Sequence, residues 1–232
     1  MTPNQITAFR VLLAFLAVGL FGHGAGANFA ALALVIAAIA LDAVDGYVAR
    51  RKKLATPLGA QLDIVGDRLI ENLFFTYFAV SGLISIWVPV IFFVRGTATD
   101  FVREVAARTG QEGFGGNWLM NTSWGKALVA SRASRALYGA LKCVCFCLLG
   151  LQLSLPAETV GAHLQMRPFS LVTATQLVVF ATIAYCLLRG FPVLWEGRRY
   201  LSAAPFAAPR KRPAPAELVG AHLQMRPVER AR

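Results

Sequence analysis

Long apolar stretches separated by short polar turns occupy most of this chain. They fall at about 6–24, 27–49, 60–82, 84–110, 128–153 and 170–191. Several of them approach the ~20 residues that a helix needs to cross a bilayer. The pattern therefore predicts an all-α, polytopic integral membrane protein with six transmembrane helices in residues 1–200. The remaining segment, 201–232, is basic and rich in proline and alanine, a composition typical of a flexible tail.

Composition and charge support the membrane assignment. The chain of 232 residues is 56% hydrophobic and only 15% charged, which is too apolar for an ordinary soluble domain. Its formal net charge is +11, and lysine and arginine concentrate at 50–53, at 103–142 and after Arg189, whereas the turns near 22–28 and 82–85 hold none. The positive-inside rule then places both termini on the cytoplasmic side. No nucleic-acid-binding motif accompanies the basic residues, so a nucleic-acid partner is not expected.

Four aspartates lie within this apolar setting at Asp42, Asp45, Asp63 and Asp67. The first two are three residues apart and the last two are four apart, so each pair lies on one face of its helix. Carboxylates next to membrane-length apolar stretches are costly and usually functional. Oxygen ligands suit hard divalent cations, and without a cation the carboxylates would repel one another. The sequence therefore predicts a metal site at the cytoplasmic ends of the second and third helices.

The residues around these aspartates carry a resemblance to a known family. The pattern resembles, without a gap, the signature of the CDP-alcohol phosphatidyltransferase family: Asp42-x2-Asp45-Gly46-x2-Ala49-Arg50-x8-Gly59-x3-Asp63-x3-Asp67. All eight fixed positions are filled, so the signal is specific. Chain length, six spans and the opening Asn4-x2-Thr7-x2-Arg10 are similar to family members over about 1–195, whereas the tail is not covered.

The resemblance implies a reaction and a role for each residue of the signature. A phosphatidyl group would pass from a CDP-linked lipid, CDP-diacylglycerol, to a hydroxyl, with release of CMP. The four aspartates would hold Mg²⁺ or Mn²⁺, and Asp67 would also be the general base. Gly46 and Ala49 would let the nucleotide approach the second helix, Arg50 would pair with a phosphate, and Gly59 would relieve crowding. The family also implies a homodimer.

The acceptor is the open part of this interpretation. Arg95, Arg103, Arg132 and Arg135 either reach to cytoplasmic headgroups or bind a phosphate of the acceptor or the donor. The opening of the chain looks like that of phosphatidylglycerophosphate synthases, which favours glycerol 3-phosphate. Against this, Arg68 stands where many of those synthases are expected to have lysine. An inositol phosphate or another alcohol is the alternative acceptor.

Other features of the sequence allow two interpretations or have no assigned function. Asn4, Thr7 and Arg10 share a helical face, which either starts the helix with an arginine reaching to the interface or faces a substrate. The aspartates could instead serve a divalent-cation carrier or channel, which would leave the other signature positions unexplained. The segment 156–168 recurs almost unchanged at 215–227, and we assign it no function.

Overall fold

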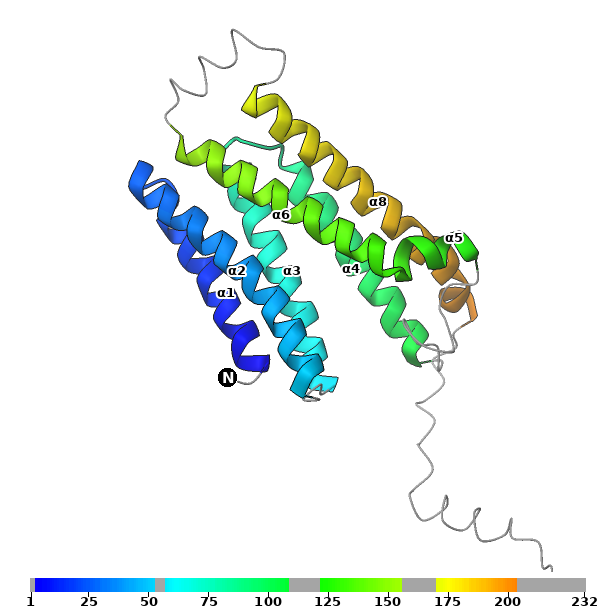
Figure 1. Ribbon diagram of the computed structural model, residues 1–232. Coiled ribbons are helices and arrows are strands. Elements are labelled where there is room, and N and C mark those ends of the chain that lie inside the picture. Colours follow the sequence, from blue (N-terminus) through cyan, green and yellow to red (C-terminus); the bar gives the residue numbers. More distant parts are fainter. Residues whose placement is uncertain (1–2, 53–56, 109–121, 156–169, 204–232) are drawn as a thin grey trace, which may run out of the picture.

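The computed structural model describes residues 3–52, 57–108, 122–155 and 170–203 (Figure 1). Within these ranges some side chains lie outside the description, namely those of 3, 43–52, 57–58, 60, 107–108 and 200–203.

Every regular element in the described ranges is a helix, which confirms the all-α prediction. The elements in chain order are α1 (Pro3–Leu20), α2 (Ala25–Lys52), α3 (Pro57–Val80), α4 (Trp87–Arg108), α5 (Ser123–Gly125), the π-helix η1 (Lys126–Ala130), α6 (Arg132–Ser154) and α8 (Leu171–Ala203).

Three of these helices contain stretches long and apolar enough to cross a membrane: Ala25–Asp42, Arg132–Ser154 and Leu171–Arg199. The apolar part of α1, Asn4–Leu20, is shorter. The helices α3 and α4 have sufficient length, with 24 and 22 residues. They also carry the acidic and basic side chains described below, which lower their hydropathy. Six spans therefore stay a prediction, of which three are supported by length and composition.

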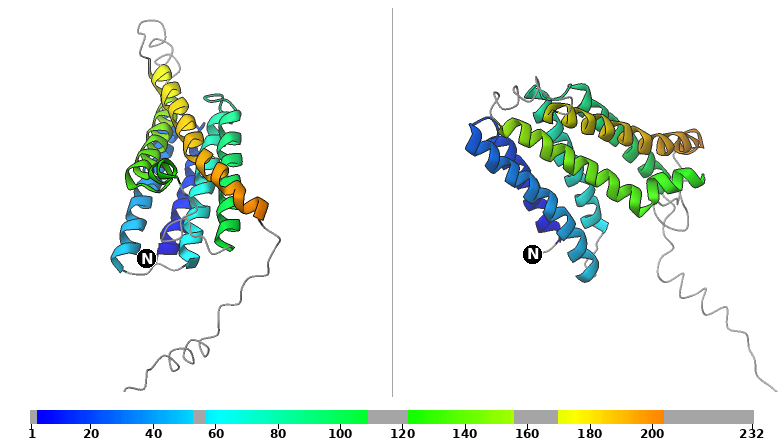
Figure 2. Two further views of the ribbon diagram at one scale, coloured as in Figure 1. Left: turned by 90° about the vertical axis from the view of Figure 1, so that its right-hand side faces the viewer. Right: turned by 45° about the horizontal axis from the view of Figure 1, so that its top comes forward.

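The helices pack as a bundle in which successive long helices run in opposite directions (Figures 1 and 2). Contacts join α1 to α2 and α3, α2 to α6, α3 to α4, α4 to α8, and α6 to α8. The start of α1, the end of α2, the start of α3 and the end of α4 all lie at the lower end of the bundle in Figure 1. This arrangement brings the signature helices α2 and α3 together with the N-terminal helix at one end.

A cluster of phenylalanines fills the centre of the bundle. Phe75 lies with its ring 4.3 Å from that of Phe92 on α4 and 4.8 Å from that of Phe146 on α6. Phe74 packs edge-on against Phe146, at 5.3 Å between ring centres. Aromatic pairs at these distances add to the gain from burying apolar area. The cluster therefore fixes α3, which carries two of the aspartates, against α4 and α6.

The predicted fifth helix, 128–153, is interrupted. Ser131 has an extended backbone, with φ −63° and ψ 144°, and separates η1 from α6. Its hydroxyl oxygen accepts the backbone N–H of Ser134 at 3.1 Å and so caps α6. The Ser134 hydroxyl in turn donates to the carbonyl of Leu128. A single continuous helix over this range was wrong, because these hydrogen bonds to serine compete with the helical ones.

The predicted sixth helix, 170–191, was too short. The helix α8 continues through Pro192 to Ala203. Pro192 is fully buried and its neighbour Val193 packs with Val102 of α4 and Val129 of η1. These contacts hold the helix beyond a residue that usually ends one. The extension carries Glu196, whose carboxylate accepts the Thr122 hydroxyl just before α5.

Candidate functional site

Three aspartates of the signature meet between α2 and α3. Asp42 comes from α2, and Asp63 and Asp67 lie one turn apart on α3. One carboxylate oxygen from each lies within 4.8 Å of the others. The side chains are about half exposed, at 49%, 48% and 46%. The site is therefore open on one side and offers several carboxylate oxygens to a ligand.

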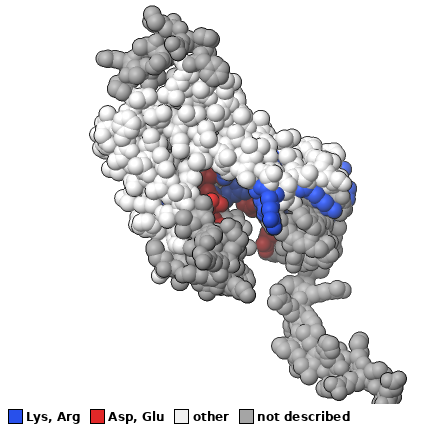
Figure 3. Space-filling model, viewed as in Figure 1, with Lys and Arg blue, Asp and Glu red and all other residues white. Residues whose placement is uncertain are grey.

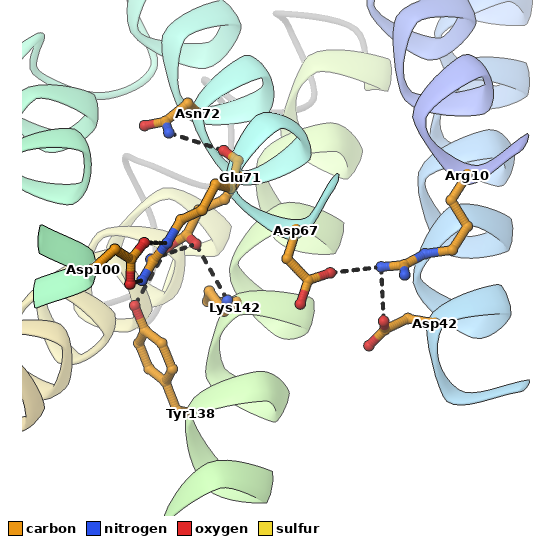
Figure 4. A network of polar contacts seen from close by, with 9 residues as sticks. Arg10, Asp42, Asp67, Glu71, Asn72, Asp100, Tyr138 and Lys142 are labelled. Carbon is orange, nitrogen blue, oxygen red and sulfur yellow. Dashed lines mark hydrogen bonds and ion pairs between the residues drawn. The ribbon is translucent and has the colours of Figure 1, made fainter. Parts of the chain in front are cut away.

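Arg10 of α1 contacts all three carboxylates, and Figure 4 shows its contacts with Asp42 and Asp67. Its Nη2 lies 2.8 Å from Oδ1 of Asp42 and 2.8 Å from Oδ1 of Asp67, and its Nη1 lies 3.2 Å from Oδ1 of Asp63. The side chain is only 4% exposed. Arg10 therefore faces the aspartates, not the solvent. Of the other two residues predicted on this face, Thr7 is buried and Asn4 is exposed.

A glycine allows α1 to come this close to α3. A methyl group added at Gly66 would lie 2.8 Å from Cγ2 of Thr7, which is closer than real carbon contacts. Gly66 immediately precedes Asp67, and Thr7 lies one turn before Arg10. The close approach of the two helices thus places the guanidinium within reach of the carboxylates.

A cavity of about 100 Å³ lies beside the aspartates. Its polar lining consists of Arg10, Asp42, Asp67, Glu71 and Lys142, and its apolar lining comes from α2, α3 and α6. In the space-filling view, acidic and basic side chains gather around a hollow on an otherwise uncharged face (Figure 3). The cavity is therefore a place where a charged ligand would meet Asp42 and Asp67.

Glu71 is the centre of a second polar cluster. It lies one turn after Asp67 and is 4% exposed. Its Oε2 lies 3.4 Å from Nζ of Lys142 and 3.6 Å from Nη1 of Arg68, and its Oε1 accepts the hydroxyl of Tyr138 at 3.3 Å. A buried carboxylate needs such partners to remain charged. These contacts tie α3 to α6.

Arg68 extends this cluster to α4. Its Nε and Nη2 donate to the two carboxylate oxygens of Asp100 at 3.1 and 3.4 Å. Nη1 of Arg103 lies 3.5 Å from Oδ1 of the same aspartate. Paired contacts between a guanidinium and a carboxylate fix both position and orientation. Asp100 therefore holds two arginines next to Glu71.

Further cations surround the ring of Tyr138. The guanidinium carbons of Arg95 and Arg189 lie 5.8 and 5.1 Å from the ring centre, and Nζ of Lys142 lies 4.6 Å from it. Arg189 is 8% exposed and donates from Nη2 to the carbonyl of Val129 at 3.1 Å. The Nε atoms of Arg95 and Arg189 are buried without a hydrogen-bond partner among the described residues. The region between α4, α6 and α8 thus holds more positive than negative charge.

Comparison with known proteins identifies the family of this chain. A family model described as CDP-alcohol phosphatidyltransferase matches residues 1–189. The chain belongs to this family.

Individual relatives cover shorter parts of the chain. A protein of Pseudomonas fluorescens named CDP-diacylglycerol--glycerol-3-phosphate 3-phosphatidyltransferase is 45% identical over 69 residues, which are 29% of this chain and 35% of that protein. A protein of the same name from Bacillus subtilis is 30% identical over 122 residues, 47% of this chain and 63% of the relative. A rice protein named cardiolipin synthase (CMP-forming) is 39% identical over 69 residues, 29% of this chain and 21% of that protein. The chain thus spans less than two thirds of the length of each of these relatives.

The aspartate cluster fits the divalent cation on which this family generally depends. The donors are carboxylate oxygens, which hard cations such as Mg²⁺ and Mn²⁺ prefer. The same three carboxylates already contact a positive group, the Arg10 guanidinium. The residues of this site are therefore suited to bind a cation of higher charge.

The other predicted residues fall into three groups. Arg95 and Arg103 lie on α4 in the basic region, and Arg132 and Arg135 are exposed on the first turn of α6. Gly59 is half-buried on α3. The remaining signature residues belong to α2, but their side chains lie outside the described residues: Asp45, Gly46, Ala49 and Arg50.

Several polar residues at the site were not predicted there. Glu71 follows Asp67 by four residues, so helical spacing alone would place it on the same face. Lys142 and Arg189 each lie within an apolar stretch, where an ionisable residue signals function by default. Tyr138 has no comparable signal in the sequence. The position of Tyr138 at the site depends on how α4, α6 and α8 pack together.

Proposed function

We propose that this protein transfers a phosphatidyl group from CDP-diacylglycerol to the hydroxyl of a phosphorylated acceptor, with glycerol 3-phosphate favoured and CMP released. The observation that carries the proposal is the meeting of Asp42, Asp63 and Asp67 beside a cavity at the contact of α1, α2 and α3. Family membership supports the reaction class, and the names of the bacterial relatives support the acceptor. Family membership also argues against a divalent-cation carrier.

The transfer requires one bond to form and one to break. The acceptor hydroxyl oxygen forms a bond to the phosphorus of the phosphatidyl group, and the bond from this phosphorus to the CMP oxygen breaks. The electron pair of that bond leaves with CMP, and the hydroxyl proton passes to the Asp67 carboxylate. Asp67 lines the cavity and is about half exposed, so its carboxylate is accessible to a bound hydroxyl.

Asp42, Asp45, Asp63 and Asp67 would hold Mg²⁺ or Mn²⁺ in this proposal. When bound, the cation would neutralise the negative charge of the diphosphate and the charge on the departing CMP. The signature residues of α2 would hold the nucleotide, with Arg50 paired to a phosphate and the small Gly46 and Ala49 admitting it to the helix. Gly59 would keep the start of α3 clear of it.

The acceptor phosphate would bind in the basic region between α4, α6 and α8. Arg95, Arg103 and Arg189 gather there, and Asp100 already positions Arg103. The buried Nε atoms of Arg95 and Arg189 have no partner among the described residues, and a phosphate oxygen is a suitable acceptor for them. Arg132 and Arg135, at the exposed start of α6, would provide attraction for an anionic acceptor rather than direct contact.

We further propose six membrane spans, with both termini and the site on the cytoplasmic side, and a homodimer. Two observations support this topology. The start of α1 and the ends of α2 and α4 lie together at one end of the bundle (Figure 1). The last residues of α2 at that end, 50–52, are basic, as expected on the cytoplasmic side.

An acceptor panel tests the proposal. Purified full-length protein in lipid nanodiscs receives CDP-diacylglycerol, Mg²⁺ or Mn²⁺, and one of glycerol 3-phosphate, inositol 1-phosphate, glycerol, inositol or serine. We expect CMP and a new phospholipid with glycerol 3-phosphate, and neither product when EDTA replaces the cation. If none of these acceptors supports CMP release, the proposed reaction is contradicted. Release with an unphosphorylated alcohol alone would contradict the acceptor class but not the reaction.

A further inference from the structure

We propose that Arg10 holds the place of the divalent cation in the metal-free protein, and that the cation displaces it on binding. The inference rests on the metal site of the proposed function. It assigns to Arg10 a role within that site: it keeps the carboxylates together while no cation is bound, and it sets how tightly the cation binds.

The contacts of Arg10 carry the first step. Its guanidinium contacts Asp42, Asp63 and Asp67, the same three side chains whose oxygens lie within 4.8 Å of one another. These residues lie 32 or more positions further along the chain than Arg10. An arginine that served only to anchor α1 would need a single carboxylate. Contact with all three places the positive charge at the centre of the cluster.

Charge balance gives the second step. Three carboxylates this close repel one another unless a positive group lies among them. A guanidinium can serve because its planar group carries five N–H donors. It brings only one positive charge, whereas a divalent cation brings two. The arginine therefore neutralises only part of the negative charge of the three carboxylates. They keep an affinity for a more highly charged ion.

Geometry gives the third step. Mg²⁺ binds oxygens at about 2.0–2.1 Å, so three carboxylates that share an ion must turn toward one point. The Oδ1 atoms of Asp42 and Asp67 instead lie 2.8 Å from the same arginine nitrogen. A cation held by these oxygens would also lie next to the guanidinium and repel it. Arg10 and the cation thus compete for the carboxylates.

The surroundings allow Arg10 to move. The side chain lines the cavity of about 100 Å³ that continues from the aspartates toward Glu71. Its Nε has no hydrogen-bond partner among the described residues, so its polar contacts with the aspartates come from the two terminal nitrogens. A displaced guanidinium can therefore turn into the cavity without first breaking further contacts of its own.

The test measures Mn²⁺ affinity, without any substrate, on the full chain in detergent. Free Mn²⁺ is followed by electron paramagnetic resonance for the wild type, Arg10→Met and the control Arg198→Met. The control removes the same charge from α8, where Arg198 lies over Trp195. We expect Arg10→Met to bind Mn²⁺ about tenfold more tightly than the wild type, a change of about 1.4 kcal/mol, and Arg198→Met to bind as the wild type does. Affinity of Arg10→Met equal to or weaker than that of the wild type would overturn the proposal.

Thermal unfolding separates this role from a purely structural one. In EDTA, Arg10→Met should melt below the wild type, and Mn²⁺ should raise its Tm by more than it raises that of the wild type. Equal rises in both proteins would contradict displacement. If Arg10→Met does not fold without metal, hydrogen exchange on the wild type decides, because Mn²⁺ should accelerate exchange around Arg10 in α1. Slower exchange there would overturn the proposal. A wild type that binds no Mn²⁺ would instead overturn the metal site itself.

Discussion

At the scale of single residues, the site depends on a close contact between two helices as much as on its charged groups. Arg10 reaches the aspartates because Gly66 lets α1 approach α3 at Thr7. Gly66 and Thr7 lie 59 positions apart, so the sequence alone does not reveal their contact.

Gly66→Ala tests this contact. The added methyl would lie 2.8 Å from Cγ2 of Thr7, so one helix must shift. Overpacking of this kind costs about 1–3 kcal/mol, so we expect a lower Tm. Because the shift also moves Arg10 away from the carboxylates, Mn²⁺ affinity should not fall below that of the wild type. The measurement is thermal unfolding in detergent with and without Mn²⁺. Thr7→Ser removes Cγ2, so adding it to Gly66→Ala should restore most of the loss. A double variant as unstable as Gly66→Ala would contradict the explanation.

The residues of the site were predictable to different degrees. Asp42, Asp63 and Asp67 were found because their spacing on two helices and the signature both point to them. The contact of Arg10 with the aspartates was not predicted. This residue at the start of the chain meets the carboxylates only because three helices pack together. Arg189 has a signal in its apolar surroundings, but its place near Arg95 depends on how α8 crosses α4.

At the scale of elements, ion pairs connect the helices around the cavity, and of their members Glu71 is buried. Glu71 of α3 contacts Lys142 and Tyr138 of α6, and Arg68 of α3 contacts Asp100 of α4. The charged contacts supplement the phenylalanine cluster on the same helix.

Glu71→Gln tests the link between α3 and α6. The change leaves the ammonium of Lys142 and the guanidinium of Arg68 near a neutral amide. Loss of one partner from a buried pair costs about 3–5 kcal/mol, so we expect a large drop in Tm. Adding Lys142→Met removes the unpaired charge and should recover part of the stability. The check is a double-mutant cycle from thermal unfolding, and strictly additive losses would contradict the pairing.

Gly190→Ala tests the contact between α4 and α8 at the proposed acceptor site. The new methyl would lie 2.8 Å from Nε of Arg95 and 2.9 Å from its Cγ, so the arginine must move. If Arg95 binds the acceptor phosphate, KM for glycerol 3-phosphate should rise about tenfold, as for the loss of a contact of about 1.4 kcal/mol. Steady-state kinetics provide the measurement. The matched control is Gly26→Ala on α2, where an added methyl meets no atom within 4 Å. An unchanged KM in Gly190→Ala would remove Arg95 from the acceptor site.

The helices themselves were largely predictable, and their ends less so. The lengths of the apolar stretches place each long helix, whereas the break at Ser131 comes from hydrogen bonds that compete with the helix. The carbonyl of Val129 in η1 is bound by Arg189, a residue 60 positions away. Such contacts between helices decide local structure that periodicity cannot show.

At the scale of the whole molecule, the proposed topology places the end of α2, the start of α3 and the site on the cytoplasmic side. Cysteine labelling in intact cells tests it, in a variant whose four native cysteines are replaced by alanine. We expect His23→Cys and Ser85→Cys, both exposed between helices, to react with a membrane-impermeant maleimide. Ser123→Cys should react only after the membrane is opened. Labelling of Ser123→Cys in intact cells would contradict the six-span arrangement.

The most direct measurement of the central claim is CMP release from CDP-diacylglycerol with glycerol 3-phosphate and Mn²⁺, compared between the wild type and Asp67→Asn. Asparagine keeps the size of the side chain but cannot take the hydroxyl proton. Loss of a general base typically lowers a rate by about 10²–10⁴-fold. We therefore expect a loss of this size in kcat, with the protein still folded by thermal unfolding. Wild-type activity in Asp67→Asn would contradict the account.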